Sequence, residues 1–171
     1  KKTGVWECRL TGNQQGRFYT VTVFDGTQWS EEITDPYSRA VGANGKRSAI
    51  VDLTKTNPSG WAIDKSPGNY SRKCNAVIYE LHIRDATIHV SSGVPEAYRG
   101  KFLGMAQTGT RNAAGETTGL DHIKELGVTH VQLLPFYDFF TVDETQSEKP
   151  QYNWGYDPLH YNVPEGSYST N

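Results

Sequence analysis

The stretch that decides the fold is AVIYELHIRDATI, residues 76–88, in which apolar and polar side chains alternate. Successive side chains of an extended strand point to opposite faces, so this alternation predicts a strand of about nine residues. Its apolar face would consist of Val77, Tyr79, Leu81 and Ile83. The opposite face becomes polar along its length and would consist of Ile78, Glu80, His82 and Arg84. Such a strand suits a barrel whose far end approaches a functional site, and it equally suits an edge strand with one wet face.

The residues after this strand predict a long connection and then a helix. Residues 89–116 are rich in glycine, serine and threonine, and a connection of that length in a compact domain is usually functional or disordered. We interpret GKFLG and TGTRNAAG within it as turns. In TTGLDHIKELG, residues 117–127, apolar side chains recur every three residues, which predicts a helix that ends at Gly127.

A second strand is predicted in VTHVQLLPFYDF, residues 128–139, which is dense in valine and leucine until Pro135 ends it. A strand, a helix and a second strand form a βαβ unit, and such a unit predicts an α/β fold with a parallel sheet. Ligands of parallel sheets bind beyond the carboxyl ends of the strands. The connection 89–116 and the residues after Pro135 would lie on that side.

The first third of the chain predicts short β-strands. GRFYTVTVF, residues 16–24, is rich in aromatic and β-branched side chains, and the DGTQW that follows indicates a hairpin turn. Further short strands are predicted in GVWECRL, residues 4–10, and AIVDL, residues 49–53. Three or four strands are too few to bury both faces of a β-sandwich, so this part is interpreted as the end of one.

The composition excludes several classes of function. With a net charge of -2 and a pI near 6.2, the 171-residue chain lacks the basic stripe of nucleic-acid-binding proteins and has no attraction to an anionic membrane surface. No apolar run reaches the length of a membrane span, and KKTGVWECRL lacks the apolar stretch of a signal peptide, so the location, extracellular or cytoplasmic, stays open. Cys8 and Cys74 have no metal-ligand spacing; we expect two buried free thiols, with a disulfide as the alternative.

The candidate binding segment is YNWGYDPLHYNVPEGSY, residues 152–168. Its prolines, glycines and asparagines predict a loop, which leaves its aromatic rings without a helix or strand to cover them. Flat rings beside amide and carboxylate groups suit the CH faces and hydroxyls of a sugar. The residues of this kind are Tyr152, Asn153, Trp154, Tyr156, Asp157, His160 and Tyr161. A small core under a long loop explains the same composition equally well.

The other chemistry-bearing residues form no complete motif. The five histidines share no zinc-binding spacing, and His82, on the polar face of the first strand, is the one of most interest. Paired carboxylates would indicate glycoside hydrolysis, and the acidic residues after the second strand are Asp138, Asp143, Glu144, Asp157 and Glu165. Asp157 before Pro158 also suits a turn, and the acids at 143 and 144 suit solvated loop charge.

The heptapeptide YNWGYDP, residues 152–158, resembles without a departure the signature of type I pullulanases, starch-debranching members of the α-amylase clan. AVIYELHIRD resembles that family's first barrel strand, and TTGLDHIKELGVTHVQLLP resembles its first helix and second strand. Residues 35–61 resemble the join between the family's starch-binding-type β-sandwich and its barrel. The departures are Ala86, where the family commonly has an aromatic residue, and Phe136-Tyr137 after the second strand.

The resemblance implies a (β/α)8 barrel that hydrolyses α-1,6 links in pullulan and in branched starch or glycogen with retention. It makes residues 1–62 the C-terminal part of a β-sandwich module with its junction, 63–75 a linker, and 76–171 the N-terminal part of the barrel. The family's nucleophile, acid and stabilising aspartate lie on later strands. No catalytic residue is therefore expected in this chain, and the rest of the same polypeptide would complete the barrel. No cofactor is implied, and no calcium ligand set is seen.

The resemblance assigns substrate-binding roles to the heptapeptide. Tyr156 would be the stacking platform under the glucose at the cleavage point, and Asp157 would order the loop or touch a hydroxyl. The surrounding wall would be shaped by Tyr152, Asn153 and Trp154.

Two competing interpretations remain. One is a non-catalytic starch-binding module that holds glucan on Trp6, Trp29 and neighbouring rings, although such a module would not need a βαβ unit. The other is a fragment of an isoamylase or branching enzyme, against which the intact heptapeptide argues.

Overall fold

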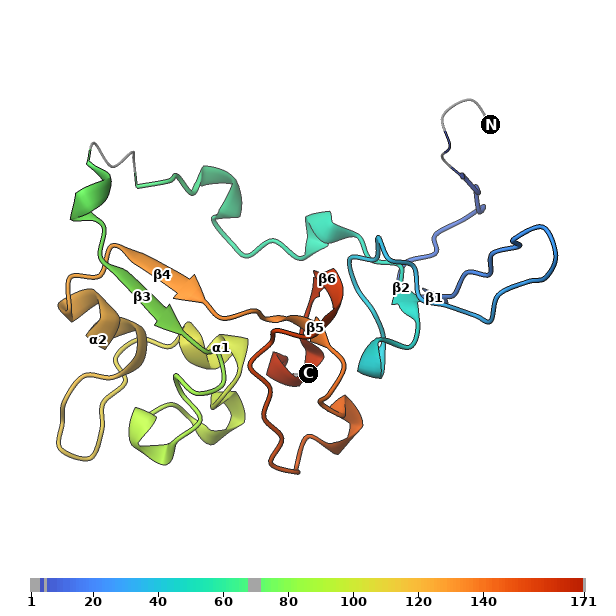
Figure 1. Ribbon diagram of the computed structural model, residues 1–171. Helices are drawn as coiled ribbons and strands as arrows, with labels where there is room; N and C mark the ends of the chain where they lie inside the picture. Colours follow the sequence, from blue (N-terminus) through green and yellow to red (C-terminus); the bar gives the residue numbers. More distant parts are fainter. Residues whose placement is uncertain (1–3, 5, 68–71, 171) are drawn as a thin grey trace.

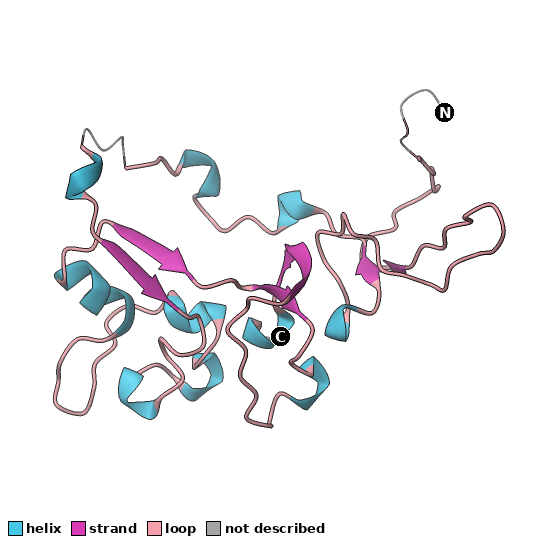
Figure 2. Ribbon diagram, viewed as in Figure 1, coloured by secondary structure: helices cyan, strands magenta, loops and turns pink. Residues whose placement is uncertain are grey.

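The computed structural model describes residues 4, 6–67 and 72–170, and these form three separate two-stranded sheets rather than one layered core (Figure 1). Most of the chain between them is loop and short helix (Figure 2). The accessible surface is 13030 Å². A compact monomer of 19.1 kDa exposes about 8400 Å² on the area–mass relation of folded proteins. A large part of the surface therefore lacks the covering that a compact domain provides.

The βαβ unit consists of strand β3 (Ile78–Leu81), helix α2 (Gly119–Glu125) and strand β4 (His130–Leu133). The two strands pair in parallel from Ile78 opposite His130 to Leu81 opposite Leu133, which confirms the predicted parallel pairing. Gly127 has a φ of 72° directly after the helix and ends it as predicted. The first strand is shorter than predicted, because the chain turns after Leu81 and the amide of Ala86 bonds the carbonyl of His82.

The connection 89–116 is ordered by short helices that pack around the buried side chains of Thr87 and Val94, each 1% exposed. It holds 3-10 helices at Val90–Ser92 and Glu96–Tyr98 and helix α1 (Phe102–Met105), so the interpretation of GKFLG as a plain turn is wrong. Thr87, 1% exposed, accepts the Gly100 amide on its hydroxyl and the Ser92 hydroxyl on its carbonyl, both at 2.9 Å. These bonds satisfy buried polar groups and fix the connection against the end of β3.

The segment after Pro135 forms an antiparallel pair of β5 (Tyr137–Phe139) with β6 (Pro158–Pro164). The prediction that residues 152–168 are loop throughout is therefore wrong for residues 158–164, whose Tyr161 and β-branched Val163 favour a strand. The buried core lies beside this pair and consists of Ile83, Phe139, Val142 and Tyr168, with Phe102, Met105 and Phe136 packed on it. Aromatic edges meet Tyr168 from two sides.

The N-terminal third forms the predicted hairpin but only part of the predicted strands. β1 (Phe18–Tyr19) pairs with β2 (Ser48–Ala49), and isolated bridges continue the hairpin from Val21–Ile33 to Phe24–Trp29 around the Asp25 turn. Residues 6–10 form no strand, and Val5 lies outside the described residues, as do residues 68–71 of the predicted linker. Cys8 and Cys74 are free but exposed, so their predicted burial is wrong. No helix of the described residues is both long and apolar enough to cross a membrane.

One asparagine joins the N-terminal third to residues 137–168, which contain β5 and β6 and are here called the β5–β6 lobe. Asn44 has a φ of 58° and makes a reciprocal pair with Glu144, donating its amide at 2.7 Å and accepting the Glu144 amide on Oδ1 at 2.8 Å. Its side-chain amide donates to Asp143 at 2.9 Å. The next residue, Gly45, packs so closely on Asp138 that a Cβ there would lie 2.8 Å from the carboxylate. We call this contact the Asn44 junction.

Replacing Asn44 with alanine should lower the free energy of unfolding by about 2 kcal/mol, since two side-chain hydrogen bonds are lost and alanine tolerates a left-handed backbone less well. Urea unfolding of the purified protein measures this. Asn44→Gly is the matched control, because it loses the same bonds without the backbone strain and should be less destabilised. Equal stability of Asn44→Ala and the wild type would contradict the proposed contribution of the junction.

Candidate functional site

Residues Tyr152–Asp157, here called the aromatic turn, are fixed by hydrogen bonds and by one close backbone approach. The side-chain oxygen of Asn153 accepts the Gly155 amide at 2.6 Å and closes a local turn. Gly155 is buried with a φ of 88°, and a Cβ on it would lie 1.9 Å from the carbonyl oxygen of Pro135. Only glycine fits between the turn and the end of β4.

A histidine directly after β3 contacts two residues of the aromatic turn. His82 is 5% exposed, and its Nε2 lies 2.8 Å from the carbonyl oxygen of Asn153. The ring of Tyr152 stacks on the His82 ring with centroids 5.3 Å apart and planes inclined by 30°. The hydroxyl of Tyr168 lies 3.1 Å from the same Nε2. The polar face predicted for the first strand therefore does reach the candidate site.

Thr141 links two of the predicted site residues and was missed by the sequence analysis. Its hydroxyl donates to the carboxylate of Asp157 at 3.1 Å and accepts a hydrogen bond from the side-chain amide of Asn153. Thr141 lies just after β5, and an isolated threonine in a loop carries no pattern that sequence reasoning can detect. The contact holds the Asp157 carboxylate at the surface of the turn.

The predicted aromatic residues divide into an exposed group and a buried group. The exposed side chains, with 50%, 63% and 64% of their surface accessible, are Tyr152, Trp154 and Tyr156. Tyr161 is also exposed, from β6. His160 is buried, and its Nδ1 lies 2.6 Å from Asp138, so it serves the packing of β5 on β6. The small-core interpretation is correct for His160 and does not describe the exposed rings.

Three of the predicted carboxylates do come together. Oxygen atoms of Asp138, Glu144 and Glu165 lie within 4.8 Å of one another, a spacing that could hold a metal ion. Each is already paired, with His160, with the Asn44 amide and with the amides of Phe139 and Ser167 respectively. Burial raises the pKa of Glu165, 1% exposed, above its ordinary value. The three carboxylates are thus engaged by hydrogen bonds around β5 and β6, and Asp157 lies apart from them at the surface.

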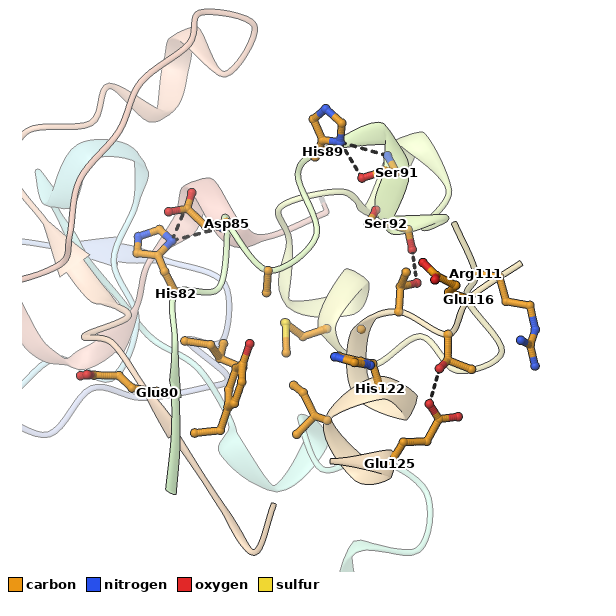
Figure 3. Close-up of a pocket in the computed structure, with 18 of the residues that line it drawn as sticks. Glu80, His82, Asp85, His89, Ser91, Ser92, Arg111, Glu116, His122 and Glu125 are labelled. Carbon is orange, nitrogen blue, oxygen red and sulfur yellow. Dashed lines mark hydrogen bonds and ion pairs between the residues drawn. The ribbon is translucent and has the colours of Figure 1, made fainter. Parts of the chain in front are cut away.

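An open pocket of about 1190 Å³ lies between the end of β3 and α2 (Figure 3). Its apolar wall includes Leu81 and Ile123, and its polar lining includes His82, Asp85 and His122. No residue of the aromatic turn lines it. A smaller pocket of about 330 Å³ reaches Asn153, beside Arg84, Lys101 and Tyr168.

Comparison with known proteins identifies relatives along almost the whole chain. No protein-family model matches. A pullulanase of Bacillus subtilis (strain 168) is 42% identical over 170 residues, covering 98% of this chain and 22% of the relative. The crystal structure of a pullulanase from Paenibacillus barengoltzii in complex with maltohexaose and α-cyclodextrin superposes with a TM-score of 0.84 and 57% identity, over 90% of this chain and 24% of that one. A maize chloroplastic isoamylase is 28% identical over 193 residues, covering 99% of this chain and 22% of the relative.

The chain is thus homologous to pullulanases over nearly all of its length and spans about a fifth of the length of the curated relatives it matches. Because the alignment covers 98% of the chain, it includes the βαβ unit and the aromatic turn.

Replacing Gly155 with alanine should destabilise the fold in two ways. A Cβ on a left-handed backbone costs about 1–2 kcal/mol by itself, and the clash with Pro135 should lower the unfolding temperature further. Gly60 measures that cost by itself, because it has a φ of 85° and nothing lies within 4 Å of the position that a Cβ would take. At Gly155 the Cβ would also meet a backbone oxygen. Thermal unfolding of Gly155→Ala and Gly60→Ala compares the two. Equal shifts would show that the close approach to Pro135 is unimportant.

The raised pKa of Glu165 predicts a pH dependence of stability. A carboxyl whose pKa is higher in the folded state than its ordinary value of 4.5 stabilises the fold most at pH values below 4.5. This contribution to the free energy of unfolding is lost as the pH rises through the raised pKa. Glu165→Gln cannot titrate, so its free energy of unfolding should decline less between about pH 4 and pH 7. Urea unfolding across this range, with exposed Glu148→Gln as control, measures the slope. Parallel curves for the wild type and Glu165→Gln would contradict the prediction.

Proposed function

We propose that this chain, whose sequence and backbone match pullulanases along nearly its whole length, is part of a retaining glycoside hydrolase that cleaves α-1,6-glucosidic links in pullulan and in branched starch or glycogen. The observation that carries the proposal is the aromatic turn within the heptapeptide YNWGYDP, whose backbone is fixed while the rings of Trp154 and Tyr156 face solvent. The α-glucan substrate is supported by relatives crystallised with maltotriose, maltotetraose and maltohexaose.

The aromatic turn supplies binding and orientation. The flat ring of Tyr156 would stack on the apolar CH face of the glucose unit at the cleavage point, where burial of both faces gives dispersion and hydrophobic stabilisation. Asp157, held by Thr141, would accept a hydrogen bond from a sugar hydroxyl. Tyr152, Asn153 and Trp154 would shape the adjacent wall. Holding the sugar in one orientation lowers the entropic part of the barrier to attack.

The chemistry itself would come from elsewhere in the polypeptide. Retaining glycosidases use two carboxyl groups about 5 Å apart on either side of the scissile bond, and in the proposed barrel these lie on later strands. Asp138, Glu144 and Glu165 are occupied by structural partners below the turn, which argues against their serving in this role. We therefore propose that this chain binds substrate and contributes no catalytic residue.

The uncovered sheet supports a larger barrel. Strands of a parallel sheet are normally buried on both faces, yet Ile78 is 62% exposed and Val131 is 43% exposed. We propose that residues 76–171 are the first part of a (β/α)8 catalytic domain, that 1–62 belong to a β-sandwich carbohydrate-binding-type module with its junction, and that 63–75 link them. Further strands of the same polypeptide would cover the exposed faces.

A second candidate is a non-catalytic glucan-binding module centred on the N-terminal hairpin. Trp29 is 67% exposed and its ring lies 5.3 Å from that of Phe24, which makes an apolar surface. Trp6 is also exposed. The βαβ unit and the aromatic turn are unexplained by that function. The intact heptapeptide YNWGYDP argues against a fragment of an isoamylase or a branching enzyme.

Release of reducing sugar from pullulan by the full-length protein tests the proposal, with a boiled sample as control. The wild type should be active, and Tyr156→Ala should lower kcat/KM by at least about tenfold, because loss of one stacking platform in a carbohydrate site removes about 1–3 kcal/mol by analogy with base stacking. Tyr37→Ala, an exposed tyrosine in the N-terminal third, is the matched control and should leave the activity unchanged. A silent wild type would overturn the proposed function, and near-normal kinetics of Tyr156→Ala would overturn the role of this ring.

A further inference from the structure

We propose that His82 is a positioning residue that fixes the aromatic turn by donating a hydrogen bond from Nε2 to the carbonyl oxygen of Asn153, 2.8 Å away. This inference rests on the proposed function, because it names the residue that orients the same binding site. His82 lies at the end of β3, while Asn153 lies 71 positions further along the chain. The bond thus connects the βαβ unit directly to the turn that would hold the sugar.

The neighbours of His82 determine which ring nitrogen carries the proton. Nδ1 faces the backbone amides of Arg84 at 3.1 Å and Asp85 at 3.3 Å, and both of these groups can only donate. Nδ1 is therefore the acceptor, and the proton of the neutral ring lies on Nε2. Nε2 faces the Asn153 carbonyl, which can only accept, so the tautomer and the contact agree. The Tyr168 hydroxyl oxygen, 3.1 Å from Nε2, accepts a second and longer hydrogen bond from the same N–H group.

The surroundings make this hydrogen bond strong and costly to lose. His82 and Tyr168 are 5% and 4% exposed, so water cannot replace a missing partner. The Tyr152 ring covers one face of His82, and the Tyr168 ring meets it edge-on with centroids 5.9 Å apart. The imidazole is thus held on two sides before substrate arrives. Figure 3 shows its place beside Asp85 at the end of the strand.

The effect of His82 on substrate binding passes through the backbone. Among the described residues, the Tyr156 ring makes no hydrogen bond or ring contact, so its direction depends on the path of the turn that precedes it. That path is fixed at Asn153 by His82 and at Gly155 by the close approach to Pro135. A displacement of about 1 Å in a positioning group can cost about a hundredfold in rate. His82 would therefore act on catalysis without touching the substrate.

Two substitutions separate the donor from the rest of the side chain. Glutamine places an amide N–H near the position of Nε2 and can keep the bond to Asn153, whereas asparagine is too short to reach and can only replace the acceptor at Nδ1. Both remove the aromatic ring, so both lose the stacking on Tyr152. His122→Gln is the matched histidine control, because His122 is exposed on α2, lines the opposite wall of the pocket and lies outside the aromatic turn (Figure 3).

The experiment measures kcat and KM for pullulan, and the unfolding temperature, with the full-length wild type and the three variants. We expect His82→Asn to lose about tenfold to a hundredfold in kcat, His82→Gln to stay within about threefold of the wild type, and His122→Gln to be unchanged. Assays run well below the lowest unfolding temperature, so that a general loss of folded protein does not produce the difference between the two substitutions.

Equal kcat values for His82→Asn and His82→Gln would overturn the positioning role. If only the packing of the imidazole ring mattered, both variants would lose the same activity, because both remove the ring. Should His82→Asn not fold, His82→Gln decides alone: near-normal turnover supports the donor role, and a loss above tenfold at an unchanged unfolding temperature overturns it. A wild type without activity on pullulan would overturn the proposed function as well, whereas an active wild type with equal variants would overturn this inference only.

Discussion

The hydrogen bonds of the buried His82 imidazole are the interactions on which the arrangement of this chain depends. His82 ends the first strand, because its carbonyl and Nδ1 accept amides of the turn that follows. It also meets Tyr168 near the C-terminal end of the described residues and Asn153 in the aromatic turn. Three segments far apart in sequence thus converge on one side chain. Removing water from such a group makes its hydrogen bonds directional constraints rather than small additions to stability.

The second constraint is the incomplete cover of the sheet. Two paired strands cannot bury both of their faces, and the exposed side chains on β3 and β4 are those that a parallel sheet normally encloses. The small buried core lies elsewhere, around Tyr168 and Phe139. The polar junction at Asn44 ties the N-terminal third to that same lobe. Order in this chain is therefore concentrated where backbone and side-chain hydrogen bonds converge, and not on the apolar faces of the parallel strands.

The sequence predicted those elements whose signal is local. The periodicity of Leu120 and Ile123 indicated the helix, and Gly127 indicated its end, because both depend on neighbouring residues only. The length of the first strand was not predicted, because the turn after Leu81 depends on hydrogen bonds from the amides of residues 84–86 to the carbonyl and Nδ1 of His82, which the alternating pattern does not show. Strand β6 forms because β5 offers a partner, against the loop composition of its own residues. Thr141 became part of the site only through folding.

The aromatic turn combines a fixed backbone with the exposed rings of Trp154 and Tyr156. Exposed aromatic surface is costly in water unless a ligand covers it, and a flexible loop would bury its rings on itself. Gly155 against Pro135, Asn153 against His82 and Thr141 against Asp157 prevent that collapse. The entropy of ordering the turn is therefore lost during folding rather than during binding, which leaves more of the stacking energy for the ligand. A rigid surface of this kind would suit the sugar ligand proposed for it, because a sugar offers one flat CH face and many hydroxyls that a mobile loop could not match.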